Sequence, residues 1–492
     1  MVVLLLLLIP LIGVCFLFLY KGDHKFASAA SLKLSFASLL VMCFRLCYWN
    51  TPEQLSFTAP WLTSLGSSFS IRMDGLGTIL SLLTTAAYFL LFWYMKSRTI
   101  ERPAAFFAWL LLAQAGMLGV FLAMDSLLFY FFWELALIPM YFLASQWGGA
   151  RRIPVTFKFF IYTFLGSVFM LIGILYLQSK TADHSFALES IKKIKLTSDQ
   201  QSWLFWLFFI AFAIKLPVFP FHTWQPDTYE ESPTPVTAIL SAIMVKMGIL
   251  GLLRWVLPLF PIASYMWGDV VMSMAVAGIV YASFLAMQQV DIKRLIAYSS
   301  IAHIGLMTAG AFALNQLAYQ GLLIQLFTHG INILGMWILV DIIERKTGTR
   351  SIDSLGGIAQ HSPTLTIFFV IIALANIALP LTNAFVGEFL LFIGILATPS
   401  TYYWVFAVVG GLGIILSAVY TLRMIRAVFY GQPNATSSMP ITLSWHEIGA
   451  LVLIVGLILF FGIYPQPLLD MTADFSKDLF GQTDITSLFR KS

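Results

Sequence analysis

Six ionisable side chains lie within long apolar stretches of this sequence, where a charge is energetically costly. An ionised side chain in the middle of a membrane helix costs roughly 2.5–3.5 kcal/mol even on lenient insertion scales. Such residues usually mark ion paths or proton relays, because carboxylates, amines and imidazoles each bind and release a proton. The six residues are Glu134, Lys215, Lys246, His303, His329 and Glu388. Their types predict the movement of protons or ions within a membrane.

Lys215 ends the apolar run WLFWLFFIAFAIK and directly precedes a break at Pro217 and Pro220. Proline interrupts a helix, and the backbone groups that it frees at membrane depth must face protein or water rather than lipid. A second break is expected at Pro380, eight residues before Glu388. The ends of half-helices can stabilise ions. We therefore expect two broken helices beside one ion path.

Glu134 and Lys215 form either a structural ion pair or a switchable one. A buried ion pair stabilises a fold only weakly, because desolvation largely cancels the attraction. Two helices in lipid can also be joined more simply by packing small residues. In the alternative, Glu134 keeps Lys215 charged while the two are close, and separation lets the desolvated lysine release its proton. We favour the switchable pair.

Each of the other four residues also has an interpretation in which it plays only a structural role. A lysine near a helix end usually extends its amine to the membrane surface, but Lys246 lies thirteen residues into an apolar run of 25 residues. A single histidine on an apolar face is more often a packed core residue, although the unperturbed pKa of an imidazole, near 6.5, suits His329 to a relay. Glu388 is either a surface carboxylate or one held at a helix break. For His303, which lies beside two serines, a packed core residue and a relay residue are equally good interpretations.

A row of titratable groups at one depth lets protons hop through intervening water, but an open pore would leak, so gating is required. Moving one charge against 100 mV costs about 2.3 kcal/mol. No G-x-G-x-x-G or Walker A motif is present, and Cys15, Cys43 and Cys47 form no C-x-x-C or His/Cys cluster. We therefore expect no cofactor and no metal in this chain, and we expect a partner to supply the energy.

Composition predicts an all-α integral membrane protein. Of the 492 residues, 59% are hydrophobic and only 10% are charged, which excludes a soluble domain. The N-terminal segment has no positive charge before its apolar run, and that run is too long for a signal peptide, so it is expected to form the first membrane helix. Apolar runs of about twenty residues predict about fourteen transmembrane helices. These are about 2–20, 27–47, 75–96, 105–124, 126–146, 156–178, 203–224, 233–257, 268–288, 295–312, 315–343, 363–397, 402–430 and 447–465.

The two proline breaks predict an internal repeat. They fall in the seventh and twelfth predicted helices, which are five helices apart and therefore run in opposite directions. Interrupted helices in corresponding positions of two halves are typical of inverted-repeat transporters. We expect two inverted five-helix repeats, helices 4–8 and 9–13. The predicted units are a three-helix segment 1–100, repeats 101–260 and 261–430, and a C-terminal helix and tail 431–492.

The distribution of lysine and arginine predicts the orientation in the membrane. The net charge of +5 is spread over short loops, which argues for membrane topology and against nucleic-acid binding. Most lysines and arginines lie in the loops that follow odd-numbered helices. These loops are therefore expected in the cytoplasm, and both termini on the other side of the membrane. The loop 179–202, with four lysines, is the exception. Glu230, Glu231 and Lys158 are expected to be solvated at helix ends.

Several long stretches resemble the antiporter-like membrane subunits of proton-translocating NADH:quinone oxidoreductase, respiratory complex I. Glutamate at the position of Glu388 matches the M-type subunit, because the L and N types have lysine there. The short C-terminus fits as well, since the L type carries a long lateral helix. The stretches are MDGLGTILSLLTT (73–85), LAMDSLLFYFFWELALIPMYFL (122–143), KFFIYT (158–163), AFAIKLPVFPFHTWQPD (211–227), DIKRLIAYSSIAHIG (291–305), QLAYQGLLIQLFTHGI (316–331) and NAFVGEF (383–389).

This resemblance implies a fold of fourteen helices with discontinuous helices 7 and 12. It also implies a proton path from Glu134 and Lys215 through Lys246 and His329 to Glu388, with His303 matching a family histidine. FMN, iron–sulfur clusters and quinone would belong to partner subunits, and the L- and N-type subunits would be neighbours. The expected location is an energy-coupling membrane, the inner membrane of a bacterium.

Two departures from the family pattern and three alternatives accompany this prediction. After Pro226-Asp227, where the family often has a histidine, this chain has Thr228-Tyr229. The segment ALPLTNAFVGEF lacks the glycines expected around Pro380, which predicts a different break geometry. The alternatives are an Mrp-type cation/proton antiporter subunit, a membrane subunit of a related hydrogenase complex, and a purely structural scaffold. Glu388 argues against the antiporter, and the row of buried charges argues against the scaffold.

Overall fold

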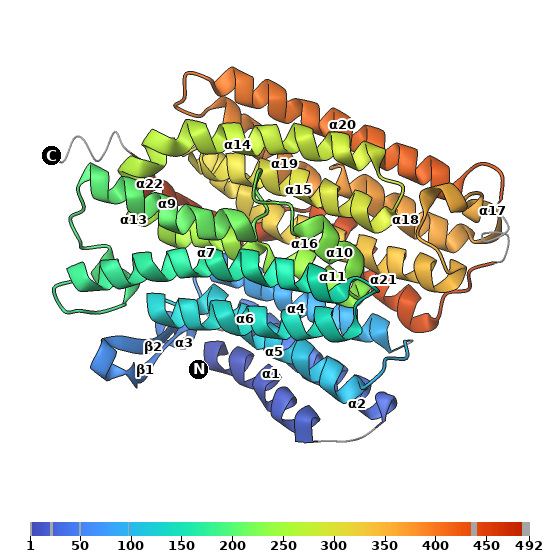
Figure 1. The fold of residues 1–492 in the computed structure, drawn as a ribbon, viewed down its shortest axis with the longest axis horizontal. Coiled ribbons are helices and arrows are strands. Elements are labelled where there is room, and N and C mark those ends of the chain that lie inside the picture. Colours follow the sequence, from blue (N-terminus) through green and yellow to red (C-terminus); the bar gives the residue numbers. More distant parts are fainter. Residues whose placement is uncertain (1, 20–22, 49–50, 97, 434–439, 485–492) are drawn as a thin grey trace.

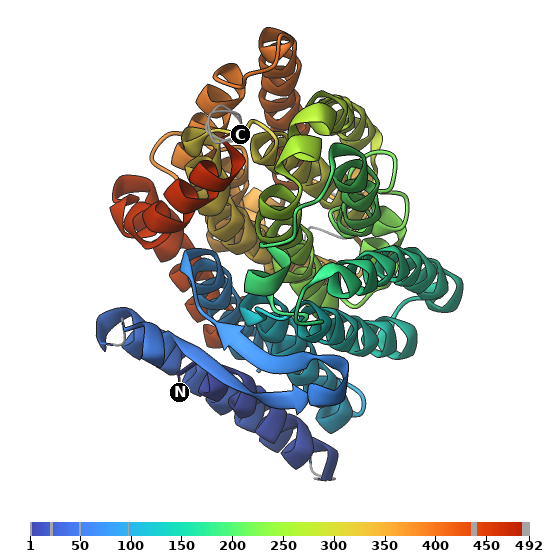
Figure 2. The ribbon, with the colours of Figure 1, turned by 90° about the vertical axis from the view of Figure 1, so that its left-hand side faces the viewer.

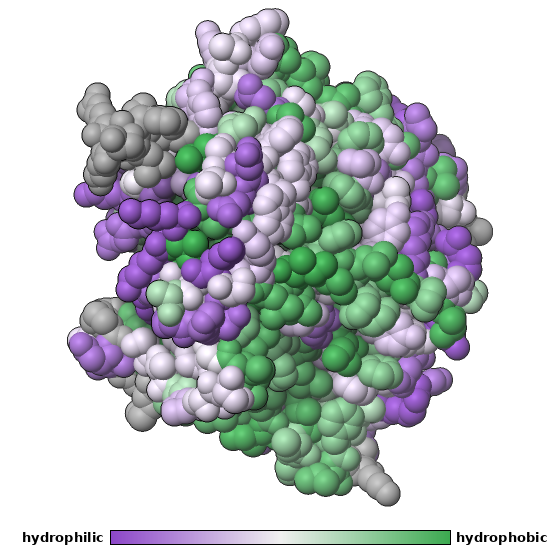
Figure 3. Space-filling view, turned by 60° about the vertical axis from the view of Figure 1, so that its left-hand side comes forward, coloured by the Kyte–Doolittle hydropathy of each residue, from purple (hydrophilic) through white to green (hydrophobic). Residues whose placement is uncertain are grey.

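Long helices run side by side in the computed structural model, which describes residues 2–19, 23–48, 51–96, 98–433 and 440–484 (Figure 1). Eleven helices in this part of the chain are long and apolar enough to cross a membrane. Apolar residues run across the middle of the face seen in Figure 3, and hydrophilic residues gather toward both ends of the helices. The prediction of an all-helical membrane protein is confirmed, whereas the count of fourteen and the repeat symmetry remain predictions.

The first half of the bundle is built from residues 2–259. Its long helices are α1 (Val2–Leu19), α2 (His24–Tyr48), α4 (Gly75–Met95), α5 (Pro103–Leu122), α6 (Ser126–Trp147), α7 (Arg152–Lys180) and α9 (Ser198–Lys215). Its shorter pieces are α3 (Pro52–Leu55), α8 (Leu188–Ile191), α10 (Gln225–Glu231), α11 (Thr234–Ile239), η2 (Leu240–Met244), α12 (Lys246–Gly251), η3 (Leu252–Val256) and α13 (Leu257–Leu259).

The second half consists of residues 261–483. Its elements are α14 (Pro261–Gln288), α15 (Ile292–Ala311), α16 (Gln316–Thr347), η4 (Ile352–Ser354), α17 (Ile358–His361), α18 (Pro363–Asn376), α19 (Asn383–Leu396), α20 (Tyr403–Phe429), α21 (Trp445–Ile463) and α22 (Gln466–Thr483). Helix α16 is the centre of the molecule, because its apolar segment is completely buried by its neighbours.

Both predicted helix breaks are present. Helix α9 ends at Lys215, and α10 begins at Gln225, so Pro217 and Pro220 lie between the two halves. Helix α18 ends at Asn376 and α19 begins at Asn383, with Pro380 between them. A proline removes one backbone donor and clashes with the preceding turn, which explains why each helix stops before it.

The second break has the unusual geometry that the missing glycines predicted. Ala378 and Leu381, on either side of Pro380, adopt φ values of 54° and 72°. This left-handed region favours glycine, because a side chain at Cβ crowds the backbone there. Two residues with side chains thus hold a conformation that glycine would adopt more easily.

Three features of the fold were not predicted from the sequence. A β-hairpin is formed by β1 (Ser56–Leu62) and β2 (Ser67–Arg72), joined by η1 (Thr63–Leu65) and paired antiparallel with Ser56 opposite Arg72. The helix between residues 234 and 259, predicted to be regular, contains the two π-helical turns η2 and η3. Helix α22 and the hairpin both lie across one end of the bundle, the end facing the viewer in Figure 2.

Candidate functional site

Five of the six predicted site residues are almost completely buried. Lys215, Lys246 and His329 are each 1% exposed, Glu388 is 5% exposed and His303 is 6% exposed. They come from α9, α12, α16, α19 and α15, so no two of them share a helix. The sixth, Glu134, lies on α6 and is half-buried, with its Oε1 atom enclosed. The fold therefore gathers the predicted residues away from lipid.

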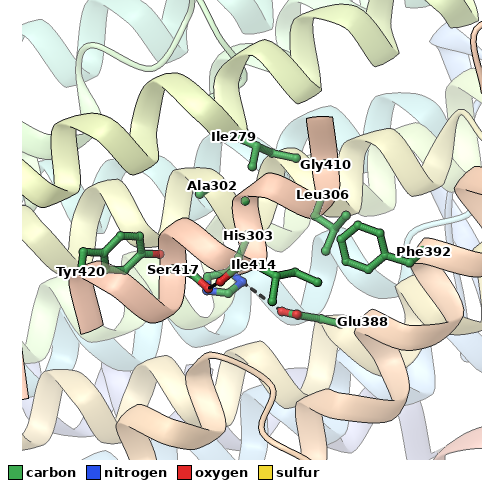
Figure 4. A pocket seen from close by; sticks show the side chains of 11 residues that line it. Ile279, Ala302, His303, Leu306, Glu388, Phe392, Gly410, Ile414, Ser417 and Tyr420 are labelled. Carbon is green, nitrogen blue, oxygen red and sulfur yellow. Dashed lines mark hydrogen bonds and ion pairs between the residues drawn. The ribbon is translucent and has the colours of Figure 1, made fainter. Parts of the chain in front are cut away.

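A continuous row of contacts joins four of these residues. The Nζ atom of Lys246 lies 2.9 Å from Nδ1 of His329. The ring centroids of His329 and His303 are 5.5 Å apart. Nδ1 of His303 lies 3.2 Å from Oε1 of Glu388, and Figure 4 shows these two side chains pointing toward each other. The row thus crosses four helices.

The backbone around Lys246 is shaped by the π-helical turn η2. Lys246 is the first residue of α12, and its Nζ atom donates a hydrogen bond to the carbonyl oxygen of Ser241 at 2.8 Å. Single π-helical turns interrupt the regular hydrogen-bond ladder and are frequent at functional sites. Here the turn supplies a backbone acceptor to a buried amine, which stabilises an otherwise costly group.

Gln325 is a site residue that was not predicted from the sequence. Its Nε2 atom donates to Oε1 of Glu388 at 3.2 Å, and Thr328 donates to its Oε1 atom at 3.1 Å. Gln325 precedes His329 by four residues on α16, so both side chains lie on one face of the helix. A polar residue one turn before a candidate histidine was the sequence signal that would have revealed it.

Close approach of α16 and α19 brings Gln325 against Glu388. A Cβ atom on Gly321 would lie 2.7 Å from the backbone nitrogen of Leu391, and one on Gly394 would lie 2.6 Å from Ala318. Such distances are too short for any side chain. The two glycines therefore let the helices pack at backbone distance, which is how small residues join helices in membranes.

A small pocket borders the far end of the row (Figure 4). His303 and Glu388 line it together with Ser417 and Tyr420 of α20. The Tyr420 hydroxyl donates to Oγ of Ser299 at 2.9 Å. The carboxylate of Glu388 thus faces a partly polar space rather than a sealed core.

Glu134 and Lys215 do not form the predicted direct ion pair. Among the described residues, Nζ of Lys215 has no hydrogen-bond partner, and no carboxylate lies at ion-pair distance from it. It lies instead 5.5 Å from the centre of the Trp133 ring and 5.9 Å from that of Phe159, at cation–π distance. In this structure the amine of Lys215 therefore packs against aromatic rings, and the switchable ion pair remains a prediction.

Lys215 and Lys246 are brought near each other by Gly248. A Cβ atom on Gly248 would lie 2.5 Å from Cγ of Leu216 and 3.0 Å from the carbonyl oxygen of Phe212. Helix α12 therefore packs directly on the end of α9, and each lysine lies within two residues of this contact. Within the described residues the two amines share no hydrogen bond.

The charged residues expected to be solvated at helix ends form an ion-pair network instead. Lys158 pairs with Asp227 at 2.9 Å, and Glu230 pairs with Arg294 at 2.7 Å. Glu231 pairs with Arg151 at 3.2 Å and is only 10% exposed. The prediction of a solvated turn was therefore wrong for Glu230 and Glu231, because α10 folds back against α7 and α15 and shields them, whereas the side chain of Lys158 is 37% exposed.

Arg350 belongs to the same ion-pair network and lies outside the membrane-spanning helices. It pairs with Asp291, Glu344 and Glu230. Burial alone would lower the pKa of Arg350, but these three carboxylates raise it above its ordinary value. The network therefore remains charged and ties the loop after α16 to α10.

Three further ion pairs with a buried partner were not recognised in the sequence. Asp341, which lies within a predicted apolar run, is 3% exposed and pairs with Arg98 at 2.6 Å and with Arg345 at 3.0 Å. Arg254 in η3 pairs with Asp74 at 2.7 Å. In each case the partner lies more than 170 residues away or one helical turn away, so only the fold shows that the charges are matched.

Comparison with known proteins identifies the family. Residues 123–417 match the family model described as NADH:quinone oxidoreductase/Mrp antiporter, TM. NADH-quinone oxidoreductase subunit M of Rickettsia prowazekii (strain Madrid E) is 36% identical over 477 residues, which cover 94% of this chain and 95% of the relative. The chain belongs to this family. The predicted resemblance is thus confirmed for the NADH:quinone oxidoreductase/Mrp antiporter family.

A further relative and two solved structures are also similar to this chain. NADH-quinone oxidoreductase subunit M of Escherichia coli (strain K12) is 37% identical over 436 residues, covering 85% of this chain and 83% of the relative. A chain of respiratory complex I from Thermus thermophilus superposes with a TM-score of 0.91 at 27% identity, covering 98% of this chain and all of that one. The Mrp complex of Dietzia sp. DQ12-45-1b shares the fold, with a TM-score of 0.82 at 22% identity over 96% of this chain and 51% of that one.

Proposed function

We propose that this chain is the M-type proton-translocating membrane subunit of an NADH:quinone oxidoreductase. The observation that carries the proposal is the row of contacts from Lys246 through His329 and His303 to Glu388. These groups are buried, titratable and within reach of one another, which is what a proton relay requires. The identity to subunit M relatives supports the M type over other members of the family.

Proton transfer along the row follows from the atoms that face each other. Protonated Lys246 gives a proton to Nδ1 of His329, whose ring releases its other proton from Nε2. Nε2 of His329 and Nε2 of His303 have no hydrogen-bond partner among the described residues, so both are available to exchange protons across the gap between the rings. His303 then passes a proton from Nδ1 to Oε1 of Glu388. Each step moves one proton and leaves the donor neutral.

Glu134 and Lys215 act as the switch that admits protons to this row. In the open arrangement Lys215 faces aromatic rings and has no carboxylate partner. A desolvated amine without a counter-charge favours its neutral form, whereas approach of Glu134 favours the charged form. Closing and opening the pair would therefore load and release one proton.

The driving energy comes from other subunits of the complex. Oxidation of NADH and reduction of quinone would occur there, on FMN and iron–sulfur clusters; the described residues of this chain form no group of side chains that could hold a metal ion. The L- and N-type subunits are the expected membrane neighbours. The N-terminal helix begins at the end of the bundle across which α22 lies, which supports an arrangement with both chain ends on the non-cytoplasmic side of a bacterial inner membrane.

A second candidate is a subunit of an Mrp-type cation/proton antiporter, because the family model covers both classes. The row itself favours protons over sodium. Hard cations bind oxygen ligands, whereas the row begins with an amine facing an imidazole. Glu388, in the place of a lysine, also distinguishes this chain from the antiporter relatives.

The proposal is tested with Lys215→Ala and Glu134→Ala in the assembled complex in membrane vesicles. We expect the complex to assemble, while coupled NADH oxidation and proton uptake fall together. Wild-type turnover and proton uptake in either variant would refute the proposed role. Sodium-for-proton exchange by the chain reconstituted without partners would instead establish the antiporter.

A further inference from the structure

Three lysines line one pocket in the loop that joins α7 to α9. Lys180, Lys193 and Lys195 border this pocket, and the acidic residue among those that line it is Asp183. This loop is the exception to the predicted distribution of positive charge, because it follows an even-numbered predicted helix. The preference of lysine for cytoplasmic loops does not account for lysines at this end of the bundle. Their position around one pocket therefore requires another explanation.

The carboxylates of this loop are engaged by other groups. Oδ2 of Asp183 accepts a hydrogen bond from the hydroxyl of Ser190 at 2.8 Å, and Oδ1 accepts one from the backbone nitrogen of Ser185 at 3.4 Å. Glu189 pairs with Arg72 at 3.5 Å. Among the described residues, no carboxylate lies at ion-pair distance from any of the three lysines. The pocket thus carries more positive than negative charge.

Backbone hydrogen bonds hold the loop against the β-hairpin and α6. The backbone nitrogen of Phe186 donates to the carbonyl oxygen of Gly66 at 3.2 Å, and that of Leu188 donates to the carbonyl oxygen of Met124 at 2.9 Å. A Cβ atom on Gly66 would lie 2.1 Å from the carbonyl oxygen of His184, so hairpin and loop meet at backbone distance. A loop fixed in this way loses less conformational entropy when it binds a ligand.

The pocket lies at the level of the lipid headgroups. Helix α7 has 29 residues and is therefore about 43 Å long, which exceeds the roughly 30 Å of hydrocarbon in a bilayer. Lys180 is its last residue, and Nζ lies 5.4 Å from the centre of the Tyr176 ring. Tyr176 in turn meets Trp203 edge to face at 4.6 Å. Tyrosine and tryptophan gather at the boundary between hydrocarbon and headgroups, so this pair marks the boundary beside the pocket.

An apolar stripe on α7 leads from this boundary toward the middle of the membrane. Phe169, Ile172 and Leu175 are 39%, 50% and 49% exposed. Their spacing of three residues places them on one side of the helix. An acyl chain fits along such a stripe while its headgroup lies in the pocket at the end of the helix.

We propose that the pocket of Lys180, Lys193 and Lys195 binds the headgroup of an anionic phospholipid in the leaflet at this end of the bundle. The ammonium groups donate charge-assisted hydrogen bonds to the phosphate oxygens. Lysines at a membrane surface are attracted to anionic lipids. A zwitterionic headgroup fits less well, because the lysines repel its amine. This binding goes beyond the proposed function and does not depend on proton transfer.

The test replaces Ala182, which is exposed and lines the pocket, with the photocrosslinking residue p-benzoylphenylalanine in the intact complex. The complex is reconstituted in vesicles with equal amounts of phosphatidylglycerol and phosphatidylethanolamine, and mass spectrometry identifies the lipids bound to the labelled peptide. We expect phosphatidylglycerol to be enriched about fivefold or more, since the attraction of one lysine to an anionic surface corresponds to about fivefold in binding.

Substitution of the lysines should remove this enrichment. The combined variant Lys180→Gln, Lys193→Gln and Lys195→Gln should crosslink the two lipids in the ratio of the vesicles. Lys193→Gln alone should lower the enrichment in part, which keeps the test decisive if the combined variant does not assemble. Lys193→Arg retains the charge and should keep the enrichment.

Lys477→Gln is the matched control. Lys477 is an exposed lysine of α22, which lies across the same end of the bundle, but it does not line the pocket. This variant should keep the full enrichment. Equal crosslinking of both lipids in the unsubstituted complex, or unchanged enrichment in Lys193→Gln and in the combined variant, would overturn the proposal. A crosslink to another subunit in place of lipid would also overturn it and would show that a protein covers the pocket.

Discussion

Lys246 and His329 meet with 2.9 Å between Nζ and Nδ1, although 83 residues separate them in the sequence. The amine reaches the imidazole because a π-helical turn precedes Lys246 and α16 passes through the centre of the bundle. This contact joins two of the basic candidates named from the sequence. It is the first contact in the row of titratable residues that ends at Glu388.

Lys246→Met should abolish the first transfer of the row. Methionine fills a similar volume but carries no proton, so coupled NADH oxidation should fall by at least about tenfold. Lys246→Arg should be equally impaired, because a guanidinium does not release its proton near neutral pH. Turnover and acidification of inverted vesicles provide the measurement. A fully active Lys246→Arg complex would mean that charge, rather than proton exchange, is what this position supplies.

Glu388→Gln should separate proton acceptance from hydrogen bonding at the end of the row. The amide keeps the shape of the side chain near His303 and Gln325 but does not accept a proton. We expect proton uptake to fall while the complex assembles normally. Gln325→Leu should be milder and should shift the pH dependence of turnover, because Gln325 only orients the carboxylate. An unchanged pH profile in Gln325→Leu would show that this contact has no positioning role.

Gly321→Ala should weaken the packing of α16 on α19. The added Cβ atom would lie 2.7 Å from the backbone nitrogen of Leu391, so the helices must separate. Overpacking of this kind typically costs about 1–3 kcal/mol, and we expect a lower melting temperature of the purified complex. Gly411→Ala is the control, since nothing lies within 4 Å of the corresponding position. Equal melting temperatures for the two variants would contradict the close approach.

The predicted orientation is tested with single cysteines in a background without Cys15, Cys43 and Cys47. Thr99 follows α4 and Ala182 follows α7, and both residues are exposed. If most positive joints face the cytoplasm, Thr99→Cys should react with a membrane-impermeant maleimide only from the cytoplasmic side. Ala182→Cys should react only from the opposite side. The reverse pattern would invert the topology, and labelling of both from one side would refute the helix count between them.

Local chemistry explains which features of this protein could be predicted from its sequence. The breaks at Pro217, Pro220 and Pro380 were predicted correctly, because a proline disrupts a helix wherever it lies. Burial of Lys215, Lys246 and Glu388 was also predictable, since a charge within an apolar run has no route to bulk water. Composition alone decided that the protein lies in a membrane.

Distances between side chains on different helices could not be predicted from the sequence. The sequence proposed Glu134 and Lys215 as partners, but aromatic rings occupy the space around the amine, and Glu388 is held by His303 and Gln325. Contacts between residues far apart in sequence depend on how helices pack, and packing is decided by all side chains of an interface together. The sequence therefore determined which groups can carry protons, and the tertiary structure decided which of them face one another.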